Sequence, residues 1–515
     1  MKTGSHASPT QTSGCAPQTL SSRPEHSLPR AEGDAEWRDL VPRASYIRRR
    51  IAMIVLVAAV PLAMRADGHS AEVPSSAHPK LTCTPAPCVL PPTQASEGGN
   101  IVTDSPIVDN PLNENQLLLG SYDGNCPGLG FHLSRDGGST WTVANCMPDI
   151  YTKQHVYQPE FDPLVGYDRH GNAYAAGEYF DTGRYGYGFV AVQESTDGTH
   201  WSKPVVALRE QGHAFAADTW LTVDTNPGSP YVDSVYASGV MVVGSRQAKN
   251  QVLVSHSTDG GKTWAQSALD SVQTYPEEDT FTRMAVGSDG TVYVTWLHCR
   301  GKKGGDGSGL CPTVHMMFSK SSDGGGTWTP PQRMATVKMP HYWWLPNTQP
   351  GIGVDNYPVI VADNSSGQYA GNLYVAMYTW TGTYLRVQVI RSTDGGNTWS
   401  TPVPLAPKTD THDQFFPAIS VSSTGVVGVS WLDRRNDPNN VNYQAFAAFS
   451  DDGGQSFQRN WQLTQAFSNP DTNGAYNWMG DYTGNTFAGP DFIAAWMDSS
   501  NGVDMQEVVG GIRLK

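Results

Sequence analysis

Charge is scarce in this sequence, and positive charge is scarcer than negative. Charged residues make up 16% of the chain, and 34 Lys and Arg stand against 48 Asp and Glu, which gives a formal net charge of -14 at pH 7. An acidic surface repels the phosphate backbone of DNA and RNA. We therefore expect no nucleic acid among the partners of this protein.

Long apolar runs are also lacking, apart from one near the N-terminus. The run from Ile51 to Met64 follows three arginines. It is shorter than the roughly 20 residues of a membrane-spanning helix, and small residues that suit cleavage follow at Ala66 and Ala71. We predict a signal peptide at 48–71, preceded by a segment, 1–47, that is disordered or an over-extended start of the reading frame. An uncleaved N-terminal anchor is the alternative; after cleavage we expect no stable membrane span.

The seven cysteines include no Cys-x-x-Cys pair, the usual signature of a zinc site, so we predict no metal of that kind. One cysteine, Cys15, precedes the predicted cleavage point. The other six fall in pairs that are close in sequence: Cys83/Cys88, Cys126/Cys146 and Cys299/Cys311. We predict three local disulfides and, with them, a secreted or periplasmic protein.

What the chain has in abundance is Gly (53), Pro (36), Trp (15) and Tyr (22). This composition is typical of many short strands joined by turns and not of a helical bundle.

One short pattern recurs along the chain, as in "STDGGKTW" and "SSDGGGTW". Its Asp recurs six times, at intervals of 58 to 71 residues: Asp136, Asp197, Asp259, Asp323, Asp394 and Asp452. Around each copy lie an acidic residue, an apolar run, a Gly turn and a strand such as "TVYVTW", followed by a third and a fourth strand.

Each repeat is therefore predicted to be a four-stranded antiparallel sheet, which cannot bury both of its faces alone. Sheets arrayed radially around an axis bury each other, so we predict an all-β fold, a β-propeller, over 99–515. Seven blades are favoured, with six as the alternative. The last repeat has three strands, and we expect 72–98, a linker and closing segment, to supply the fourth.

The Asp of the recurrent turn is predicted to be structural. Ser and Asp side chains bond to nearby backbone groups, Gly tolerates positive φ, and the Trp packs between sheets. These turns resemble the Asp-box (BNR) repeats of sialidase-like propellers, and the resemblance covers about 101–515. It implies the fold; activity varies among such propellers.

Innermost strands are predicted to begin near one central pocket, on the face opposite the Asp turns. They open with acidic residues: Asp104, Glu160, Asp218, Asp279, Asp355, Asp413 and Asp481. Carboxylates clustered there would raise one another's pKa, as acid–base chemistry requires. The alternative is that they cap strand ends or bind a cation such as calcium; we predict no other cofactor.

Second strands end in "WLH", "WLD" and "WMD", which places His298, Asp433 and Asp498 beside this pocket. Basic residues follow: Arg300, Lys302, Lys303, Arg434 and Arg435. The guanidinium groups of the arginines could hold a ligand carboxylate in bidentate fashion, or these arginines could pair with Asp433 or Asp437. Aromatic residues in the connections between blades could stack on sugar rings or pack between blades: Tyr342, Trp343, Trp344 and Trp478.

The resemblance to sialidases implies a Tyr nucleophile activated by Glu, an Asp acid, and three Arg that grip the substrate. The first of these Arg has no counterpart here, because no Arg lies between Arg65 and Arg135. Loose matches for the other roles are Tyr482 as nucleophile, Glu277 or Glu278 as its base, and Asp413 or Asp481 as acid, with Asp279 beside them.

The predicted function is that of an exported, monomeric, sialidase-like propeller, an exo-glycosidase that acts on glycans. Two alternatives remain: a propeller that binds glycans or proteins without catalysis, and a polysaccharide lyase, which would use a Tyr or His base beside Arg or Lys.

Overall fold

The computed structural model describes residues 81–515, apart from 185, 211, 244–248, 275, 301–310, 349–350 and 474–477. The predicted signal peptide, the segment before it, Cys15, Lys302 and Lys303 lie outside the described residues. The regular structure of the described part is 31 β-strands and two short 3-10 helices, η1 (His341–Trp343) and η2 (Pro470–Asn473).

The strands form seven antiparallel sheets, numbered here as blades 1 to 7. Blade 1 contains β2 (Val102–Thr103), β3 (Ile107–Asn110), β4 (Asn113–Asp123), β5 (Leu129–Ser134) and β6 (Thr142–Cys146). Blade 2 contains β7 (Ile150–Tyr151), β8 (Val156–Tyr167), β9 (Ala173–Asp181), β10 (Gly188–Ser195) and β11 (Val205–Leu208).

The next three blades follow in chain order. Blade 3 contains β12 (Ala214–Val223), β13 (Val235–Val243), β14 (Lys249–Ser257), β15 (Ala265–Ala268) and β16 (Gln273–Thr274). Blade 4 contains β17 (Glu277–Val286), β18 (Val292–Arg300), β19 (Thr313–Ser321) and β20 (Gln332–Lys338). Blade 5 contains β21 (Val359–Ala362), β22 (Leu373–Trp380), β23 (Leu385–Ser392) and β24 (Val403–Pro404).

The last two blades complete the set. Blade 6 contains β25 (Gln414–Val421), β26 (Val427–Asp433), β27 (Gln444–Ser450) and β28 (Gln458–Gln462). Blade 7 contains β29 (Gly484–Ala488), β30 (Asp491–Asp498), β31 (Gln506–Arg513) and β1 (Cys88–Gln94).

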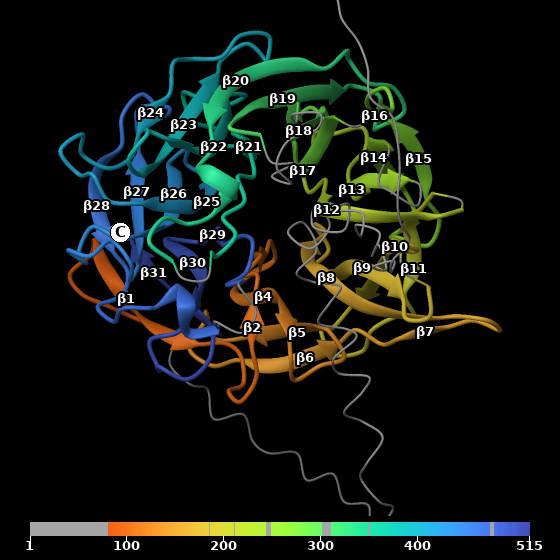
Figure 1. Cartoon of the computed structure of the whole chain (residues 1–515), viewed down its shortest axis with the longest axis horizontal. Helices are drawn as coiled ribbons and strands as arrows, with labels where there is room; N and C mark the ends of the chain where they lie inside the picture. Colours follow the sequence, from red (N-terminus) through yellow and green to blue (C-terminus); the bar gives the residue numbers. More distant parts are fainter. Residues whose placement is uncertain are drawn as a thin grey trace, which may run out of the picture. The chain divides into compact units, whose positions relative to one another are not determined.

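These sheets form a closed ring around an axis, and the predicted seven-bladed propeller is confirmed (Figure 1). The innermost strands of successive blades contact one another all the way round, and β29 of blade 7 contacts β3 of blade 1. The ring closes as the sequence predicted, because β1 pairs with β31 as the outermost strand of blade 7.

The middle strands of the blades read as unbroken apolar runs because each is covered on both faces by neighbouring blades. Every residue of β26 and of β30 is buried. Trp296, Trp431 and Trp496, at equivalent places in three second strands, are at most 2% exposed and lie in the layers between blades.

The Asp turns join the third and fourth strands of blades 1 to 6. In the turn at Asp323, Oδ1 accepts hydrogen bonds from Ser321 Oγ (2.7 Å) and from the backbone N–H of Thr327 (2.8 Å), and Oδ2 accepts one from Thr327 Oγ1 (2.6 Å). Gly324 and Gly325 take φ of 72° and 90°, which a residue with a Cβ adopts only under strain. These bonds lower the pKa of Asp323 to about 2.

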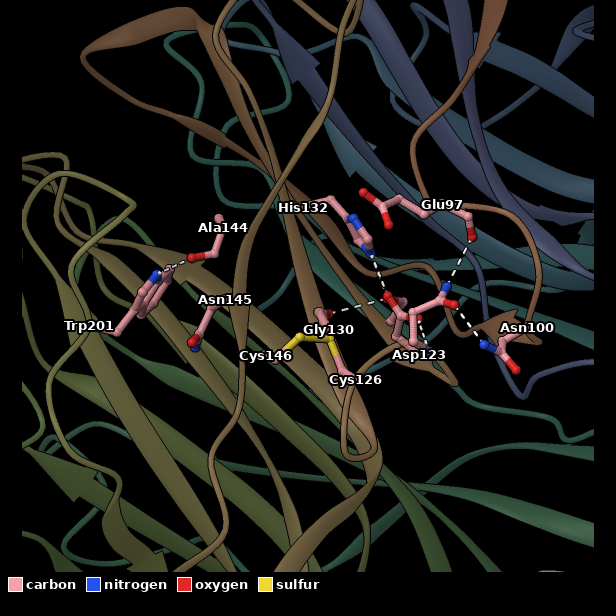
Figure 2. Close-up of a disulfide and its surroundings, with 12 residues drawn as sticks. Glu97, Asn100, Asp123, Cys126, Gly130, His132, Ala144, Asn145, Cys146 and Trp201 are labelled. Atoms are coloured by element: carbon pink, nitrogen blue, oxygen red, sulfur yellow. Dashed lines mark hydrogen bonds and ion pairs between the residues drawn. A yellow bond between two sulfur atoms is a disulfide. The ribbon is translucent and has the colours of Figure 1, made fainter. Parts of the chain in front are cut away.

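The three predicted disulfides, Cys83–Cys88, Cys126–Cys146 and Cys299–Cys311, are present. Figure 2 shows Cys126–Cys146, which ties the loop after β4 to the end of β6. Beside it, His132 Nε2 lies 3.4 Å from the carboxylate of Asp123, and both side chains are 1% exposed. No helix in the described part of the chain is long and apolar enough to cross a membrane.

Candidate functional site

The inner strands are interrupted at matching places by β-bulges. In blades 2, 3, 4 and 6, the regular pairing with the second strand is broken and resumes at Leu164, Trp220, Arg283 and Ala418. The residue two places before each resumption has left-handed backbone, with φ of 48° to 61°: Asp162, Asp218, Phe281 and Phe416. A bulge re-aims the side chain it carries, here at four equivalent positions.

The other three blades carry matching residues. Asp104, between β2 and β3, also has left-handed backbone, with φ of 66°. Tyr357 and Tyr482 lie two residues before the first residues of β21 and β29. We call these seven residues the axial ring: Asp104, Asp162, Asp218, Phe281, Tyr357, Phe416 and Tyr482.

The axial ring has an acidic half and an aromatic half. Blades 1 to 3 contribute its three Asp, and blades 4 to 7 contribute its four aromatic residues. Tyr357 lies against Phe281 and Tyr482, with ring centroids 4.5 and 5.5 Å away. Asp162 Oδ2 accepts the backbone N–H of Thr219 in the next blade (2.6 Å), so the acidic half also links blades.

One guanidinium lies within this ring. Arg283 is 1% exposed, and its Cζ is 4.2 Å from the ring centroid of Trp220, 3.7 Å from Tyr357 and 4.6 Å from Tyr482. These residues come from blades 3, 4, 5 and 7, which meet only at the axis. Arg283 and its three rings therefore fill the axis at this depth.

The charge of Arg283 is held by its surroundings. Burial lowers the pKa of Arg283, and the two tyrosines and the carboxylates of Asp162 and Asp218 act against this effect. Burial also raises the pKa of Tyr357 and of Tyr482 well above the usual value, so both phenols keep their protons. Arg283 Nη1 donates to the backbone oxygen of Thr282 (2.9 Å).

A pair of carboxyl groups lies nearer the face where the inner strands begin. Glu278 is five residues before Arg283 in β17, and burial, then the charges of Asp218 and Asp279, raise its pKa to about 7. Asp218 accepts a hydrogen bond from Thr280 Oγ1, so its carboxylate is positioned by blade 4. Blades 3 and 4 thus place a carboxyl group with a raised pKa, that of Glu278, close to the carboxyl group of Asp218.

A second carboxyl group with a raised pKa comes from blade 2. Burial raises the pKa of Glu160 to about 7, and its Oε2 is buried without a hydrogen-bond partner. Such an atom is costly to leave unpaired unless a ligand or water completes it.

Blade 4 also carries a histidine that is oriented by a buried carboxylate. His298 Nδ1 is 2.9 Å from Asp279 Oδ1, and His298 Nε2 is 3.4 Å from Glu277 Oε2. The hydrogen bond with Asp279 is the main cause of the raised pKa of His298. Blades 6 and 7 have Asp433 and Asp498 where blade 4 has His298, and each of those Asp accepts the indole N–H of the Trp two residues before it.

In blade 4 the carboxylate comes from the inner strand instead. Trp296 Nε1 donates to Asp279 Oδ1 (3.0 Å), the same oxygen that faces His298. Next to it, burial and then a hydrogen bond with Asp279 raise the pKa of Asp270 to about 8.

The acidic residues expected at the start of the inner strands do not lie at one height. Relative to the residue where pairing resumes or begins, Glu160, Asp279 and Asp355 lie four residues before. Asp413 lies five residues before the corresponding residue of its own strand, Asp481 lies three residues before it and Asp218 two. A shift of one residue turns a side chain to the other face of a strand, so these groups cannot all face one pocket.

Asp413 has a different environment from the one the sequence predicted. Its Oδ2 is 3.2 Å from Arg434 Nη1, both side chains are fully buried, and Asn440 and the backbone of Leu385 donate to the same carboxylate. Arg435 likewise pairs with Asp433. These two arginines therefore hold carboxylates of the chain itself, the alternative that was left open for them.

Asp481 and Tyr482 are also engaged. Asp481 Oδ1 accepts the indole N–H of Trp478 (2.6 Å), and its backbone N–H donates to Asp104 Oδ1 (2.6 Å). Tyr482 is 3% exposed, and its hydroxyl donates to the backbone oxygen of Pro163 (2.9 Å). We therefore do not assign the role of nucleophile to Tyr482.

Of the remaining predicted binding residues, some are buried in the packing between elements and others are exposed at the surface. Trp343 is 6% exposed and donates to the backbone oxygen of Cys311. Trp344 is 42% exposed, and its ring centroid lies 4.8 Å from that of Tyr342, with the two rings tilted by 37°. Arg300 lies at the surface and pairs with Glu277.

Sequence reasoning missed Asp162, Tyr357, Arg283 and Trp220. A usable signal was present, because every residue of the axial ring is followed by Ser, Thr or Pro. As for a metal, the described residues contain no cluster of three or more His, Cys, Asp or Glu that could hold one. A structural calcium ion remains a prediction.

No protein-family model matches the chain, and no curated protein matches it. Solved structures of similar fold include a polysaccharide lyase, an ulvan lyase, with 13% identity and a TM-score of 0.46, covering 81% of this chain and 95% of that one. Another is an α-L-arabinofuranosidase from Fusarium graminearum, with 12% identity and a TM-score of 0.43, covering 70% of this chain and 98% of that one. A third is a sialidase from Streptococcus pneumoniae, with 10% identity and a TM-score of 0.41, covering 68% of each chain. Similarity at this level concerns the fold and assigns no activity.

Proposed function

We propose that this protein is an exported, exo-acting glycoside hydrolase, with Glu278 as the general acid and Asp218 as its charged partner. The observation that carries the proposal is the contrast between these two groups. Glu278 is held near pKa 7 by burial and by the negative charge of Asp218, which is the arrangement by which glycosidases keep one carboxyl protonated beside one carboxylate.

In this mechanism Glu278 donates its proton to the oxygen of the scissile glycosidic bond as that bond breaks. Asp218, fixed by Thr280, faces the positive charge that develops on the sugar and acts as nucleophile or as base toward water. Trp220, which is partly exposed and stacks on Arg283, offers a ring for the sugar to lie against.

The axis beneath this pair is filled by Arg283 and its three aromatic rings. A sugar that enters from the face where the inner strands begin therefore meets a closed end, which favours action on chain termini. Export is supported by the three disulfides.

A glycan-binding protein without catalysis is the second candidate. It is favoured by the partly exposed aromatic side chains on the same face, among them Trp344 and Tyr342. Such a protein would need the rings but not the contrast between Glu278 and Asp218.

The test is turnover of fluorogenic sialoside, arabinoside and glucoside substrates by the wild type and by Glu278→Gln and Asp218→Asn. We expect hydrolysis of at least one substrate and a loss of more than about a hundredfold in kcat in each variant. The matched control, Glu97→Gln, changes an exposed glutamate and should retain wild-type activity. No hydrolysis by the wild type, or full activity in Glu278→Gln, would refute the proposal; ultraviolet absorbance from unsaturated uronate products would instead reveal a lyase.

A further inference from the structure

Five aromatic rings follow one another across the face where the inner strands begin. Trp478 and Tyr122 have centroids 5.3 Å apart, and Tyr122 and Phe161 are 6.4 Å apart. Phe161 and Phe180 are 5.7 Å apart, as are Phe180 and Phe215. We call this row the aromatic arc: Trp478, Tyr122, Phe161, Phe180 and Phe215.

The arc passes over four blades. Trp478 precedes β29 of blade 7, Tyr122 is near the end of β4 in blade 1, Phe161 and Phe180 are in blade 2, and Phe215 is at the start of β12 in blade 3. The starts of inner strands and the ends of second strands lie on one face of a propeller, so all five rings belong to the face of Glu278 and Asp218. The row leads to blade 3, which carries Asp218.

All five side chains are partly exposed. Packing alone would bury aromatic rings in the layers between blades, as it buries Trp296, Trp431 and Trp496. A contiguous row of rings held at the surface instead marks a binding surface.

The polar groups beside the arc are carboxyls. Glu160 adjoins Phe161 in β8 and has a buried Oε2 without a hydrogen-bond partner, and Glu178 pairs with Phe161 across the strands. Asp181 follows Phe180, and its Oδ2 lies 2.9 Å from Arg184 Nε, which neutralises the charge of Arg184 locally, and 3.0 Å from His155 Nδ1. This environment disfavours an anionic ligand, and carboxyl oxygens suit the hydroxyl groups of a neutral sugar.

We propose that the aromatic arc binds a neutral glycan chain, several sugar units long, and leads its end toward Asp218 and Glu278. The inference rests on the proposed function for the role of that end, but the binding itself does not require catalysis. Tyr122 and Phe161 are stacked, and the other neighbouring rings meet edge to face or tilted, so the arc is a continuous but uneven apolar surface for sugar rings to lie against. Uncharged hydroxyls suit the carboxyl border.

The test is affinity electrophoresis of the whole protein in gels that contain a polysaccharide. Neutral probes are debranched arabinan, mixed-linkage β-glucan and galactomannan, and anionic probes are polygalacturonate and polysialic acid. We expect retardation by at least one neutral probe and by neither anionic one. Phe180→Ala and Phe215→Ala should each weaken it by about fivefold.

The control variant is Tyr151→Ala, which removes a ring that is 73% exposed and lies outside the arc, and it should bind as the wild type does. Circular dichroism and thermal unfolding show whether each variant is folded, and Phe180→Leu, which keeps bulk without a flat ring, should lose binding as Phe180→Ala does. Retardation only by anionic probes, by no probe, or equally by all arc variants would overturn the inference.

The two proposals fail separately. Glu278→Gln should bind the neutral probe as tightly as the wild type, whatever its turnover. Binding that depends on the arc in a protein without hydrolysis would refute the proposed function alone, and hydrolysis of short substrates without arc-dependent binding would refute this inference alone.

Discussion

At the scale of single residues, several side chains with shifted pKa values lie where blades 3 and 4 meet. Glu278 and Asp270 both have raised pKa values, and the hydrogen bond with Asp279 raises the pKa of His298. Burial raises the pKa of Glu160 in blade 2 as well, whereas the buried carboxylate of Asp413 accepts hydrogen bonds from Arg434 and Asn440. Raised carboxyl pKa values gathered at one place mark a functional region more often than a structural one.

Asp270 makes the protein less stable as the pH rises. Its pKa is raised from 3.8 to about 8 in the folded state, chiefly by burial, so between these values the folded state binds a proton that the unfolded state has lost. That contribution to stability is complete below the unfolded pKa and is lost as the pH rises toward 8.

Asp270→Asn should remove this dependence. The amide oxygen can still accept the backbone N–H of Val252, and the amide N–H can donate to Asp279. We expect the variant to gain more than about 1 kcal/mol over the wild type at pH 8 and little at pH 5, measured by urea unfolding at both pH values. An equal effect at the two pH values would show that Asp270 does not titrate in this range.

At the scale of structural elements, the sequence predicted the turns well and the inner strands poorly. A turn is specified by residues that are adjacent in the chain, so "SSDGGGTW" identifies its own geometry. The inner strands contain one extra residue at each bulge. Asp218 and Asp413, both predicted to open an inner strand, therefore lie at different positions relative to the bulge. Nothing in the local alternation of apolar and polar residues shows where that extra residue lies.

The same bulges explain why the axial ring was missed. Asp162 and Tyr357 face the axis because of the backbone at or before the strand, whereas Glu160, two residues earlier than Asp162, was the more conspicuous candidate from the sequence. Only the pairing register between the strands, which the folded structure supplies, shows that Asp162 and not Glu160 lies at the axial position.

The Asp turns should contribute measurably to stability. Asp323→Ala removes three hydrogen bonds that close one turn, and we expect a loss of about 1 to 2 kcal/mol in the free energy of unfolding, measured with urea. The control is Asp289→Ala, which removes one such bond, to Thr291, from the turn after β17, and should cost less. Equal losses would mean that the network around Asp323 is not what stabilises its turn.

At the scale of the whole molecule, the repeat was sufficient to predict the propeller. Six copies of a turn at near-equal spacing, with a seventh repeat short of a strand, required a closing segment, and β1 occupies that place. The ring brings Trp220, Arg283, Tyr357 and Tyr482 together although up to 262 residues separate them, and local sequence reasoning could not find such a cluster.

The arrangement of blades also contributes to the raised pKa of Glu278, which burial and then the charge of Asp218 produce. Glu278 and Asp218 come from different blades, and the charge of the one acts on the other only because the ring places blades 3 and 4 side by side. The central claim is therefore that the carboxyl group of Glu278 titrates near pH 7 in the folded ring, and not near the ordinary glutamate value.

The most direct test is a carbon-13 NMR titration of the glutamate carboxyl groups, with Glu278 assigned by its loss in Glu278→Gln. The account predicts a midpoint near pH 7 for Glu278 and a lower midpoint in Asp218→Asn, where the neighbouring negative charge is removed. A midpoint near the ordinary glutamate value of 4.5, unchanged in Asp218→Asn, would contradict it.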